Sequence, residues 1–276
     1  MARDELHQPE RARPLDDHEL AALTRRYVGP GVAALALTGS HARGDAHGHS
    51  DIDLLRFMER ERATARERYH LDLISGRLVS VSATTLAAKR AELAQPETAI
   101  WAVPGLRQAR ALYDRDGDLA ALLAEAHAFL WTPELRRAAD AYASDALAGL
   151  AEEVHKLLGA LERGDESAML YAALGLQQGL TRAALVARCV LLTSENAYFA
   201  EALALDGANS HWRRLLRLVA GFDAPAPGTS PARARGVAAL WLYVQAAEML
   251  AGALTVEDCA LVAESVGRIR HALREQ

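Results

Sequence analysis

Residues 37–55 read LTGSHARGDAHGHSDIDLL, and they join two short apolar segments through a polar loop. The first segment, residues 32–38, is bounded by glycines, which is typical of a buried strand. The second segment, residues 51–58, is also a strand candidate. Gly39 and Ser40 suit a tight turn at the end of the first strand. The sequence therefore predicts a strand, a turn into a short helix, and a second strand.

Two aspartates stand at the start of the second predicted strand. Alternation along a strand places Asp51 and Asp53 on one face and Ile52 on the other, toward the core. Carboxylates this close repel each other unless a cation lies between them, and Mg²⁺ prefers such oxygen ligands together with water and substrate phosphates. The turn is expected to direct backbone N–H groups and the Ser40 hydroxyl toward a phosphate, while Arg43 could hold either a phosphate or a structural carboxylate. This combination indicates phosphoryl or nucleotidyl transfer.

The motif resembles the signature of the nucleotidyltransferase superfamily that includes DNA polymerase beta. Its residues are Gly39-Ser40-x-Ala42-Arg43-Gly44 and Ser50-Asp51-Ile52-Asp53. More narrowly, it is similar to the bacterial branch with the aminoglycoside nucleotidyltransferases and the minimal nucleotidyltransferases. The resemblance implies that Gly39 and Ser40 bind a nucleoside triphosphate and that Asp51 and Asp53 bind two Mg²⁺ ions. These ions would activate an acceptor hydroxyl and stabilise the leaving pyrophosphate.

The family usually carries a third carboxylate on a later strand, often the second arm of a hairpin. Here two strand-like runs, 69–74 and 78–82, flank a glycine and predict a hairpin. Its second arm has Ser80 and Ser82 where the acid is expected, and the hairpin's only carboxylate is Asp72, on the first arm. Either Asp72 is the third catalytic carboxylate or the site lacks its usual base. Loss of a general base commonly weakens catalysis by about 10²–10⁴-fold.

From about residue 116 to the end, alanine, leucine and arginine recur at three- and four-residue spacing, which predicts helices. We therefore expect an α+β fold, with an N-terminal nucleotidyltransferase-type mixed sheet and helices followed by an all-helical bundle. The expected boundaries are a leader at 1–14, a nucleotidyltransferase domain at 15–115 and a helical domain at 116–276. The main helices are expected at 16–27, 84–95, 133–163, 166–193, 232–252 and 256–274.

Several polar residues of the predicted helical domain are candidates for binding. Glu152, His155 and Lys156 share one side of a helix, because residues three and four apart are neighbours. In a functional interpretation Lys156 reaches the triphosphate, and Glu152 or Glu153 supplies a base. The alternative is an ion pair on a solvated face. Glu195 either contacts the acceptor or belongs to a helix cap.

Charge and hydropathy exclude other classes of protein. The 276 residues carry 31 Lys+Arg and 36 Asp+Glu, a net charge of −5, so a generally basic nucleic-acid-binding body is not expected. No run of about 18 uncharged apolar residues is present, and the polar N-terminus lacks an apolar targeting segment. Two cysteines far apart in sequence cannot form a zinc cluster or a disulfide framework. These features lead us to expect a cytoplasmic protein without membrane or nucleic-acid partners.

Together these features predict an Mg²⁺-dependent nucleotidyltransferase. It would move a nucleoside monophosphate from a nucleoside triphosphate such as ATP to a hydroxyl of a small-molecule acceptor. By resemblance alone, an aminoglycoside-like antibiotic is a plausible acceptor, and antibiotic resistance a plausible role. Two alternatives remain open: a catalytically weak or inactive binding or regulatory module, and an enzyme that nucleotidylates a partner protein.

Overall fold

The structure is a computed structural model of the chain, and it describes residues 11–62 and 64–274. The chain divides into two compact units. One comprises the described residues up to Ala94 together with Trp101–Leu130, and the other comprises Gln95–Ile100 and the residues from Trp131 onward. The predicted boundary at residue 115 falls within the first unit, between a strand and a helix.

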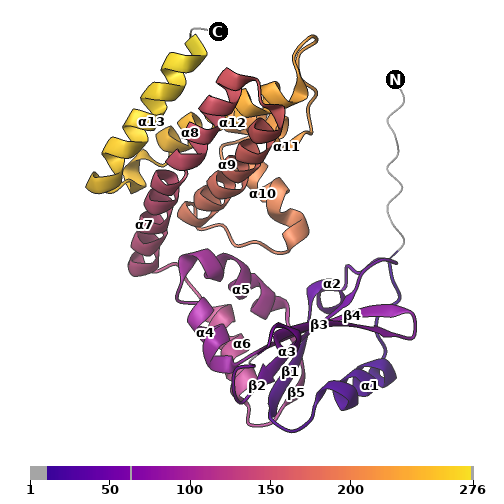
Figure 1. The fold of residues 1–276 in the computed structure, drawn as a ribbon. Helices are drawn as coiled ribbons and strands as arrows, with labels where there is room; N and C mark the ends of the chain where they lie inside the picture. Colours follow the sequence, from indigo (N-terminus) through magenta and orange to yellow (C-terminus); the bar gives the residue numbers. More distant parts are fainter. Residues whose placement is uncertain (1–10, 63, 275–276) are drawn as a thin grey trace. The chain divides into compact units, whose positions relative to one another are not determined.

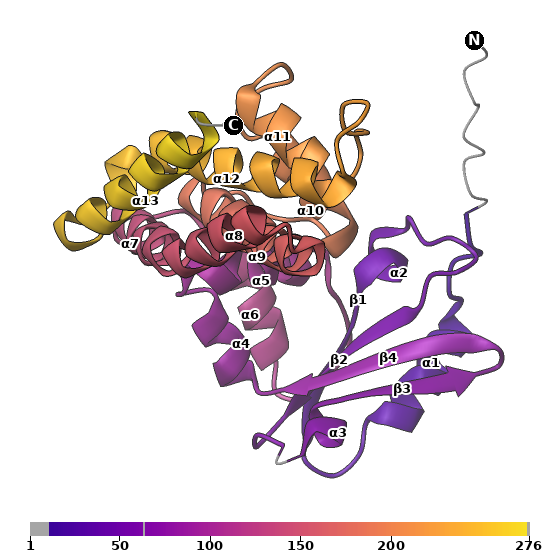
Figure 2. The ribbon, with the colours of Figure 1, turned by 45° about the horizontal axis from the view of Figure 1, so that its top comes forward.

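The first unit is built on a mixed sheet of five strands in the order β3-β4-β2-β1-β5 (Figure 1). The strands are β1 (Val32–Thr38), β2 (Ile52–Met58), β3 (Tyr69–Ile74), β4 (Arg77–Thr84) and β5 (Arg110–Asp114). Strands β2 and β4 are parallel, and the other neighbours are antiparallel. Figure 2 shows β3 and β4 as the hairpin predicted from the glycine between two apolar runs. With the helices described below, this sheet confirms the predicted α+β fold class.

One face of the sheet is covered by α1 (Asp17–Tyr27). The helix is amphipathic, and its residues Leu20, Leu23 and Tyr27 are buried. They pack against alternate residues of the three central strands, namely Leu35, Leu37, Ile52, Leu54, Val79 and Val81. Because the side-chain period of a strand is two, the intervening residues of these strands must point to the opposite face.

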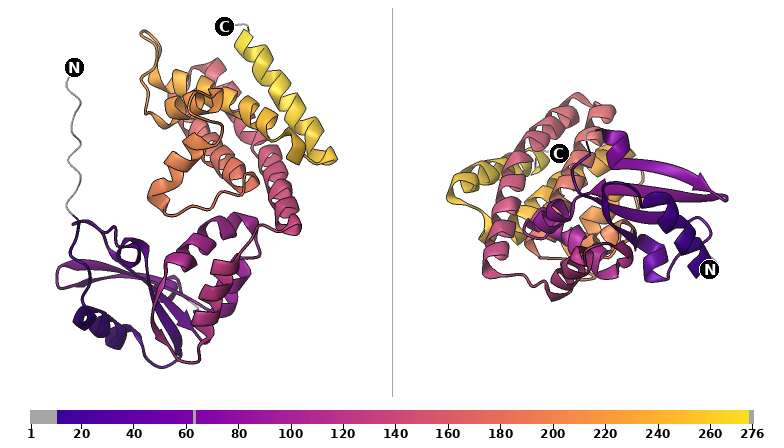
Figure 3. Two further views of the ribbon diagram at one scale, coloured as in Figure 1. Left: turned by 180° about the vertical axis from the view of Figure 1, so that it is seen from behind. Right: turned by 90° about the horizontal axis from the view of Figure 1, so that it is seen from below.

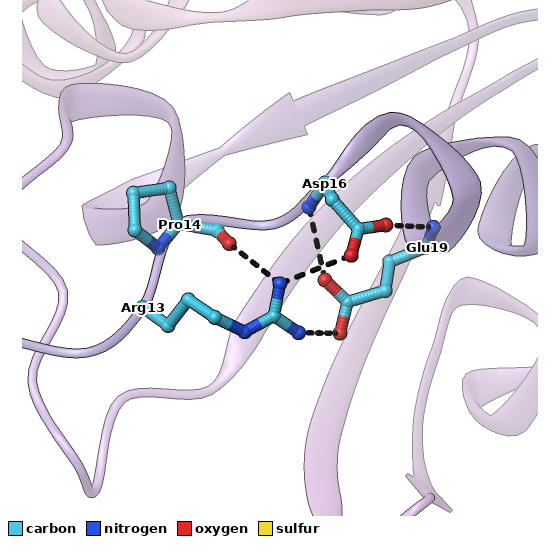
Figure 4. Close-up of polar contacts among 4 residues, drawn as sticks. All are labelled: Arg13, Pro14, Asp16 and Glu19. Atoms are coloured by element: carbon cyan, nitrogen blue, oxygen red, sulfur yellow. Dashed lines mark hydrogen bonds and ion pairs between the residues drawn. The ribbon is translucent and has the colours of Figure 1, made fainter.

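The start of α1 is fixed by a capping box (Figure 4). The Asp16 carboxylate accepts a hydrogen bond from the Glu19 backbone N–H, and the Glu19 carboxylate accepts one from the Asp16 N–H, both at 2.9 Å. The Arg13 guanidinium donates to both carboxylates, at 3.0 and 2.8 Å, and to the Pro14 carbonyl at 3.4 Å. Such a box satisfies backbone donors that the first helical turn leaves unpaired. The box places the start of α1 where the helix over residues 16–27 was expected to begin, and residues 1–10 of the leader predicted at 1–14 lie outside the described residues.

The opposite face packs against helices that follow the hairpin. These are α4 (Leu86–Glu92), α5 (Pro96–Gln108) and α6 (Asp118–Ala128). A short α3 (Ala65–Arg68) precedes the hairpin. Phe57, Leu119 and Leu122 are fully buried in the core of this face. The sequence predicts a helix over 84–95 that Pro96 would end, and in the structure Pro96 also begins α5. Proline is favoured at a first helical position, where no N–H partner is needed.

The second unit is a bundle of helices (Figure 3, pink through orange to yellow). They are α7 (Pro133–Gly149), α8 (Ala151–Arg163), α9 (Glu166–Ala187), α10 (Tyr198–Ala204), α11 (His211–Ala220), α12 (Pro231–Met249) and α13 (Val256–Arg274), with 3-10 turns η1 (Glu195–Ala197) and η2 (Ala251–Ala253). The single helix expected over 133–163 is wrong, because the chain divides at Leu150 into α7 and α8. The Leu150 side chain lies against Gly179 of α9, where a Cβ would collide with it. In the described part of the chain, no helix has the length and hydropathy needed to span a membrane.

The Asp114 side chain holds the start of α6 against the sheet. Its two carboxylate oxygens accept backbone N–H groups of Gly117, Leu119 and Ala120, at 3.1, 3.3 and 2.9 Å. We expect Asp114→Ala to lower the free energy of opening of α6 by about 1 kcal/mol, the usual cost of losing a cap. Amide hydrogen exchange of α6 measures this cost. Asp116→Ala is the control, because that carboxylate pairs only with Arg115 among the contacts described, and equal acceleration in both variants would contradict the prediction.

Candidate active site

The sheet register brings the glycine turn to the second aspartate of the motif. Thr38, the last residue of β1, pairs with Asp53 of β2, and helix α2 (Gly39–Arg43) begins at the next residue. Gly39 has a φ of +65°, and a Cβ at that position would overlap the Asp53 carboxylate. Glycine is therefore required twice, once by the left-handed backbone and once by the neighbouring carboxylate.

Helix α2 presents backbone donors but is short. Its five residues end at Arg43, and the next residue, Gly44, caps the helix in the left-handed conformation. The N–H groups of Gly44 and Asp45 both donate to the Ser40 carbonyl. The macrodipole of a helix is a sum over aligned peptides, so one turn contributes little. Phosphate binding at this turn would rest on individual N–H groups and the Ser40 hydroxyl, not on a helix dipole.

Asp51 lies directly before β2 and acts electrostatically on His41 of α2. Burial lowers the pKa of His41 below its usual value, and the nearby Arg77 guanidinium lowers it further. The Asp51 and Glu19 carboxylates oppose that shift. Both predicted Mg²⁺-binding aspartates thus lie beside α2, one near His41 and the other near Gly39.

Arg43 contacts two side chains of its own unit. Its Nε donates to the Asp45 carboxylate at 3.0 Å, and its Nη1 donates to the Gln108 side chain at 3.3 Å. The ion pair tightens the loop after α2, and the second bond ties that loop to α5. Its predicted role in binding a nucleotide stays a prediction.

Asp72 does not lie with the paired aspartates. It pairs with Val79 in the β3–β4 hairpin, and Val79 belongs to the face covered by α1. The Tyr27 hydroxyl donates to the Asp72 carboxylate at 2.6 Å, and Arg26 adds a contact at 3.5 Å. The structure therefore corrects the hypothesis that Asp72 is the third catalytic carboxylate, because Asp72 and Asp53 lie on opposite faces of the sheet.

The strand neighbour of Asp53 is a serine. In the parallel register, Ser80 of β4 pairs with Asp53 and Ser82 pairs with Leu55, so both serines share the face of Asp53. Ser80 is buried. Among residues 11–62 and 64–274, no cluster of three or more His, Cys, Asp and Glu side chains could hold a metal ion. The β4 arm thus carries hydroxyls where the resemblance implies an acid.

Comparison with protein families agrees with this geometry. Residues 20–100 match the nucleotidyltransferase domain family. The match covers α1 from Leu20 onward, the glycine turn, both aspartates and the hairpin. Among solved structures, a nucleotidyltransferase-like protein from Exiguobacterium sibiricum is similar at 13% identity and a TM-score of 0.47, over 93% of this chain and 78% of that one. A comparison with curated proteins gives no match.

The first unit has a cavity of about 260 Å³ beside Asp53. It is lined by Thr38, Asp53, Leu54, Leu55, Ser80, Ser82, Lys89, Glu92, Trp101, Ala102, Gly105 and Leu106. Across it from the strands, Lys89 Nζ donates to Glu92 at 2.7 Å, and these side chains are 19% and 34% exposed. Sequence patterns did not point to Lys89 or Glu92. The available signal was that Lys89 is one of only two lysines in the chain.

The candidate residues of the helical unit form contacts of their own. Lys156 on α8 contacts Glu152 at 2.9 Å and Glu153 at 2.7 Å, which raises the pKa of Lys156 above its usual value. This is the ion pair that the sequence left as an alternative. Glu195 is exposed at the start of η1. The predicted roles of these four residues toward a triphosphate or an acceptor stay predictions.

The residues of the site suit Mg²⁺. This ion is usually held by one or two protein carboxylates together with water and substrate phosphates, instead of a complete protein cage. Asp51 and Asp53 supply two carboxylates, and the Gly39 backbone leaves the Asp53 carboxylate room that a side chain would fill. A two-carboxylate site that needs the substrate phosphates to complete its ligand shell accounts for these features.

Two glycines with the same backbone conformation allow a test of the close approach. Gly39 and Gly44 both have positive φ, but a Cβ at Gly44 meets no atom within 4 Å. We expect both alanine variants to pay about 1–2 kcal/mol for a left-handed conformation. Gly39→Ala should lose about 1–3 kcal/mol more from overpacking against Asp53. Thermal unfolding of the two variants measures the difference, and equal losses would show that Asp53 does not require the glycine.

The contact between α1 and Asp72 predicts a pH dependence. Burial, followed by the bond to Asp72, raises the pKa of Tyr27 to about 12. The Tyr27 hydroxyl in turn lowers the pKa of Asp72. The neutral phenol therefore stabilises the fold fully below pH 10, and this contribution is lost as the pH rises from about 10 through 12.

Tyr27→Phe should remove this alkaline loss and return the pKa of Asp72 toward its usual range. Unfolding measured between pH 9 and 12 and an NMR titration of the Asp72 carboxyl report the two effects. An unchanged Asp72 titration in Tyr27→Phe would mean that the hydroxyl does not bond to this carboxylate in solution.

Proposed function

We propose that this protein is an Mg²⁺-dependent nucleotidyltransferase that transfers a nucleoside monophosphate, from ATP or another nucleoside triphosphate, to a hydroxyl of a small-molecule acceptor. The observation that carries the proposal is the packing of the Gly39 turn against the Asp53 carboxylate. It brings backbone donors for phosphate oxygens beside a carboxylate that can bind metal. The family match over residues 20–100 includes both elements.

The roles of the residues follow from their positions. The backbone N–H groups near Gly39 and the Ser40 hydroxyl would bind the phosphates, and Asp51 and Asp53 would hold two Mg²⁺ ions. Bound Mg²⁺ neutralises charge on the transferred phosphoryl group and on the leaving pyrophosphate, and it makes the acceptor hydroxyl more acidic. The protein's own contribution is to align the acceptor oxygen with the α-phosphorus. Lys156, Glu152, Glu153 and Glu195 of the helical unit are proposed contacts for the triphosphate or the acceptor.

An aminoglycoside-like antibiotic remains a proposed acceptor class by resemblance to the bacterial branch. Such a molecule is polycationic and would need several acidic residues around it. In the described part of the nucleotidyltransferase domain, the acids lining the cavity are Asp53 and Glu92, and Glu92 is paired with Lys89. An acceptor panel must therefore include neutral hydroxyl compounds as well as aminoglycosides.

A second candidate function has its own support. Ser80 occupies the strand position beside Asp53 where the resemblance implies a carboxylate. A domain without that base could bind a nucleotide and transfer it slowly or not at all, and so act as a regulatory module. Tight nucleotide binding without turnover under any acceptor is the result that would favour this candidate.

Asp51 and Asp53 at the proposed site can be compared with Asp72, which faces α1, in a direct test. With Mg²⁺ and each nucleoside triphosphate, we expect pyrophosphate release that Asp53→Ala or Asp51→Ala lowers by three orders of magnitude or more, in the range of about 10³–10⁵ seen for key charge-stabilising groups. Asp72→Asn is the control, because Asp72 faces α1 on the opposite side of the sheet, and it should retain the wild-type rate. A coupled assay for pyrophosphate, with and without the acceptor panel, gives the rates.

Binding separates a failed site from a missing acceptor. Mn²⁺ in place of Mg²⁺ can be followed by electron paramagnetic resonance in the presence of ATP. We expect Asp53→Ala to weaken Mn²⁺ binding and Asp72→Asn to leave it unchanged. Equal Mn²⁺ affinity in the wild type and Asp53→Ala would refute the assignment of the site.

A further inference from the structure

The nucleotidyltransferase domain lacks a proton acceptor on β4, and the cavity in front of that strand contains one. Ser80 and Ser82 have hydroxyls where the resemblance implies a carboxylate. A serine hydroxyl does not remove a proton from another hydroxyl at neutral pH, so the base must come from another element. Between Asp53 and the helices that follow the hairpin, the lining of the cavity includes one further carboxylate, that of Glu92.

We propose, on the basis of the proposed function, that the cavity beside Asp53 is the acceptor site and that Glu92 takes the proton of the acceptor hydroxyl. In this step the acceptor oxygen forms a bond to the α-phosphorus of the triphosphate. The bond from that phosphorus to the pyrophosphate oxygen breaks, and the pyrophosphate leaves with the bonding electron pair. The acceptor proton moves to a Glu92 carboxylate oxygen, so no oxidant or other co-reactant is needed.

The two serines of β4, which stand where the resemblance implies a carboxylate, also contribute to the shape of the cavity. Ser80 and Ser82 are shorter than aspartate, so they leave space in front of β2 and β4. The opposite wall is formed by Glu92 and Lys89 of α4 and by Trp101 and Gly105 of α5. A carboxylate on α4 can thus reach into space that a carboxylate on β4 would fill.

Lys89 allows the Glu92 carboxylate to stay charged in this partly shielded place. The ammonium and carboxylate are 2.7 Å apart, and the lysine side chain is only 19% exposed. Charges removed from water are tolerated when they are paired. When Glu92 receives the acceptor proton, the Lys89 ammonium remains beside the reacting oxygens, where negative charge develops.

The cavity also indicates the class of acceptor. Its volume of about 260 Å³ lies below the roughly 300–1,000 Å³ of sites for drug-sized ligands. Its lining combines hydroxyls, one ion pair and the flat apolar surface of Trp101. A single hydroxyl-bearing ring, such as a monosaccharide or cyclitol, has polar edges and apolar faces that match this lining. The ammonium of Lys89 offsets the charge of Glu92, which lowers the attraction of the cavity for a polycation.

The test compares two ion pairs, Lys89–Glu92 within α4 and Arg90–Glu125 between α4 and α6. Glu92→Gln keeps the size of the side chain but cannot accept the proton, and we expect kcat for pyrophosphate release to fall by about 10²–10⁴-fold with unchanged KM and affinity for ATP. Glu125→Gln breaks the neighbouring pair with Arg90, which lies outside the cavity lining and is about half exposed. We expect this control to stay within about twofold of the wild type. The acceptors are water, a panel of monosaccharides and cyclitols, and aminoglycosides.

A rescue variant distinguishes chemistry from packing. Ser80→Asp, added to Glu92→Gln, places a carboxylate on β4 beside Asp53 of β2. The double variant should have a kcat at least tenfold higher than that of Glu92→Gln alone. Wild-type turnover in Glu92→Gln, with Asp53→Ala inactive, overturns this inference and leaves the proposed function standing. A loss that Ser80→Asp does not restore assigns Glu92 a structural role and also overturns the inference. Absence of turnover in the wild type with every acceptor overturns the proposed function itself.

Discussion

The close approach of a backbone turn to a carboxylate is the constraint on which this site depends. Gly39 follows the last residue of β1, and its φ of +65° turns the chain across Asp53 of β2. The absence of a side chain there allows the peptide and the carboxylate to occupy adjacent space. The N–H groups that we propose to bind phosphate and the carboxylate oxygen that we propose to bind metal can then contact the same substrate. A Cβ at this position would overlap the Asp53 side chain, so a larger residue requires the carboxylate to move.

The rest of the domain keeps this contact in register. Antiparallel pairing of Thr38 with Asp53 sets where the turn begins, and parallel pairing of Asp53 with Ser80 sets which strand lies beyond it. Two hydrophobic cores, one on each face of the sheet, oppose any slip. A slip of one residue would exchange the faces of every side chain on a strand. Asp53 would then point into the core under α1, where an unpaired carboxylate is costly.

The sequence predicted the features that local patterns determine. The apolar run 32–38 between glycines, the aspartate pair and the hairpin around residues 75 and 76 each carry their signal within a few residues. The role of Asp72 could not be read in this way, because the face of a hairpin arm depends on its register with β4 and on the packing of Tyr27. The break at Leu150 is not marked by a proline, and the Leu150 side chain lies against Gly179, far along the chain. Sequence patterns missed Glu92 because only the folded chain brings α4 to the cavity beside Asp53, which lies 39 residues earlier in the sequence.

The third acid of the site illustrates the difference between a chemical requirement and a sequence position. A proton acceptor must lie within hydrogen-bond reach of the acceptor oxygen, and any element that reaches this point can carry it. A carboxylate on β4 would stand directly beside Asp53, and the two like charges would repel each other without a metal. On α4, the carboxylate of Glu92 is accompanied by Lys89. The formal charge of Asp51, Asp53, Glu92 and Lys89 is then −3 + 1 = −2, which limits that repulsion. The same lysine reduces the net negative charge and with it the attraction for cationic acceptors, so the position of the base and the choice of acceptor are linked through one side chain.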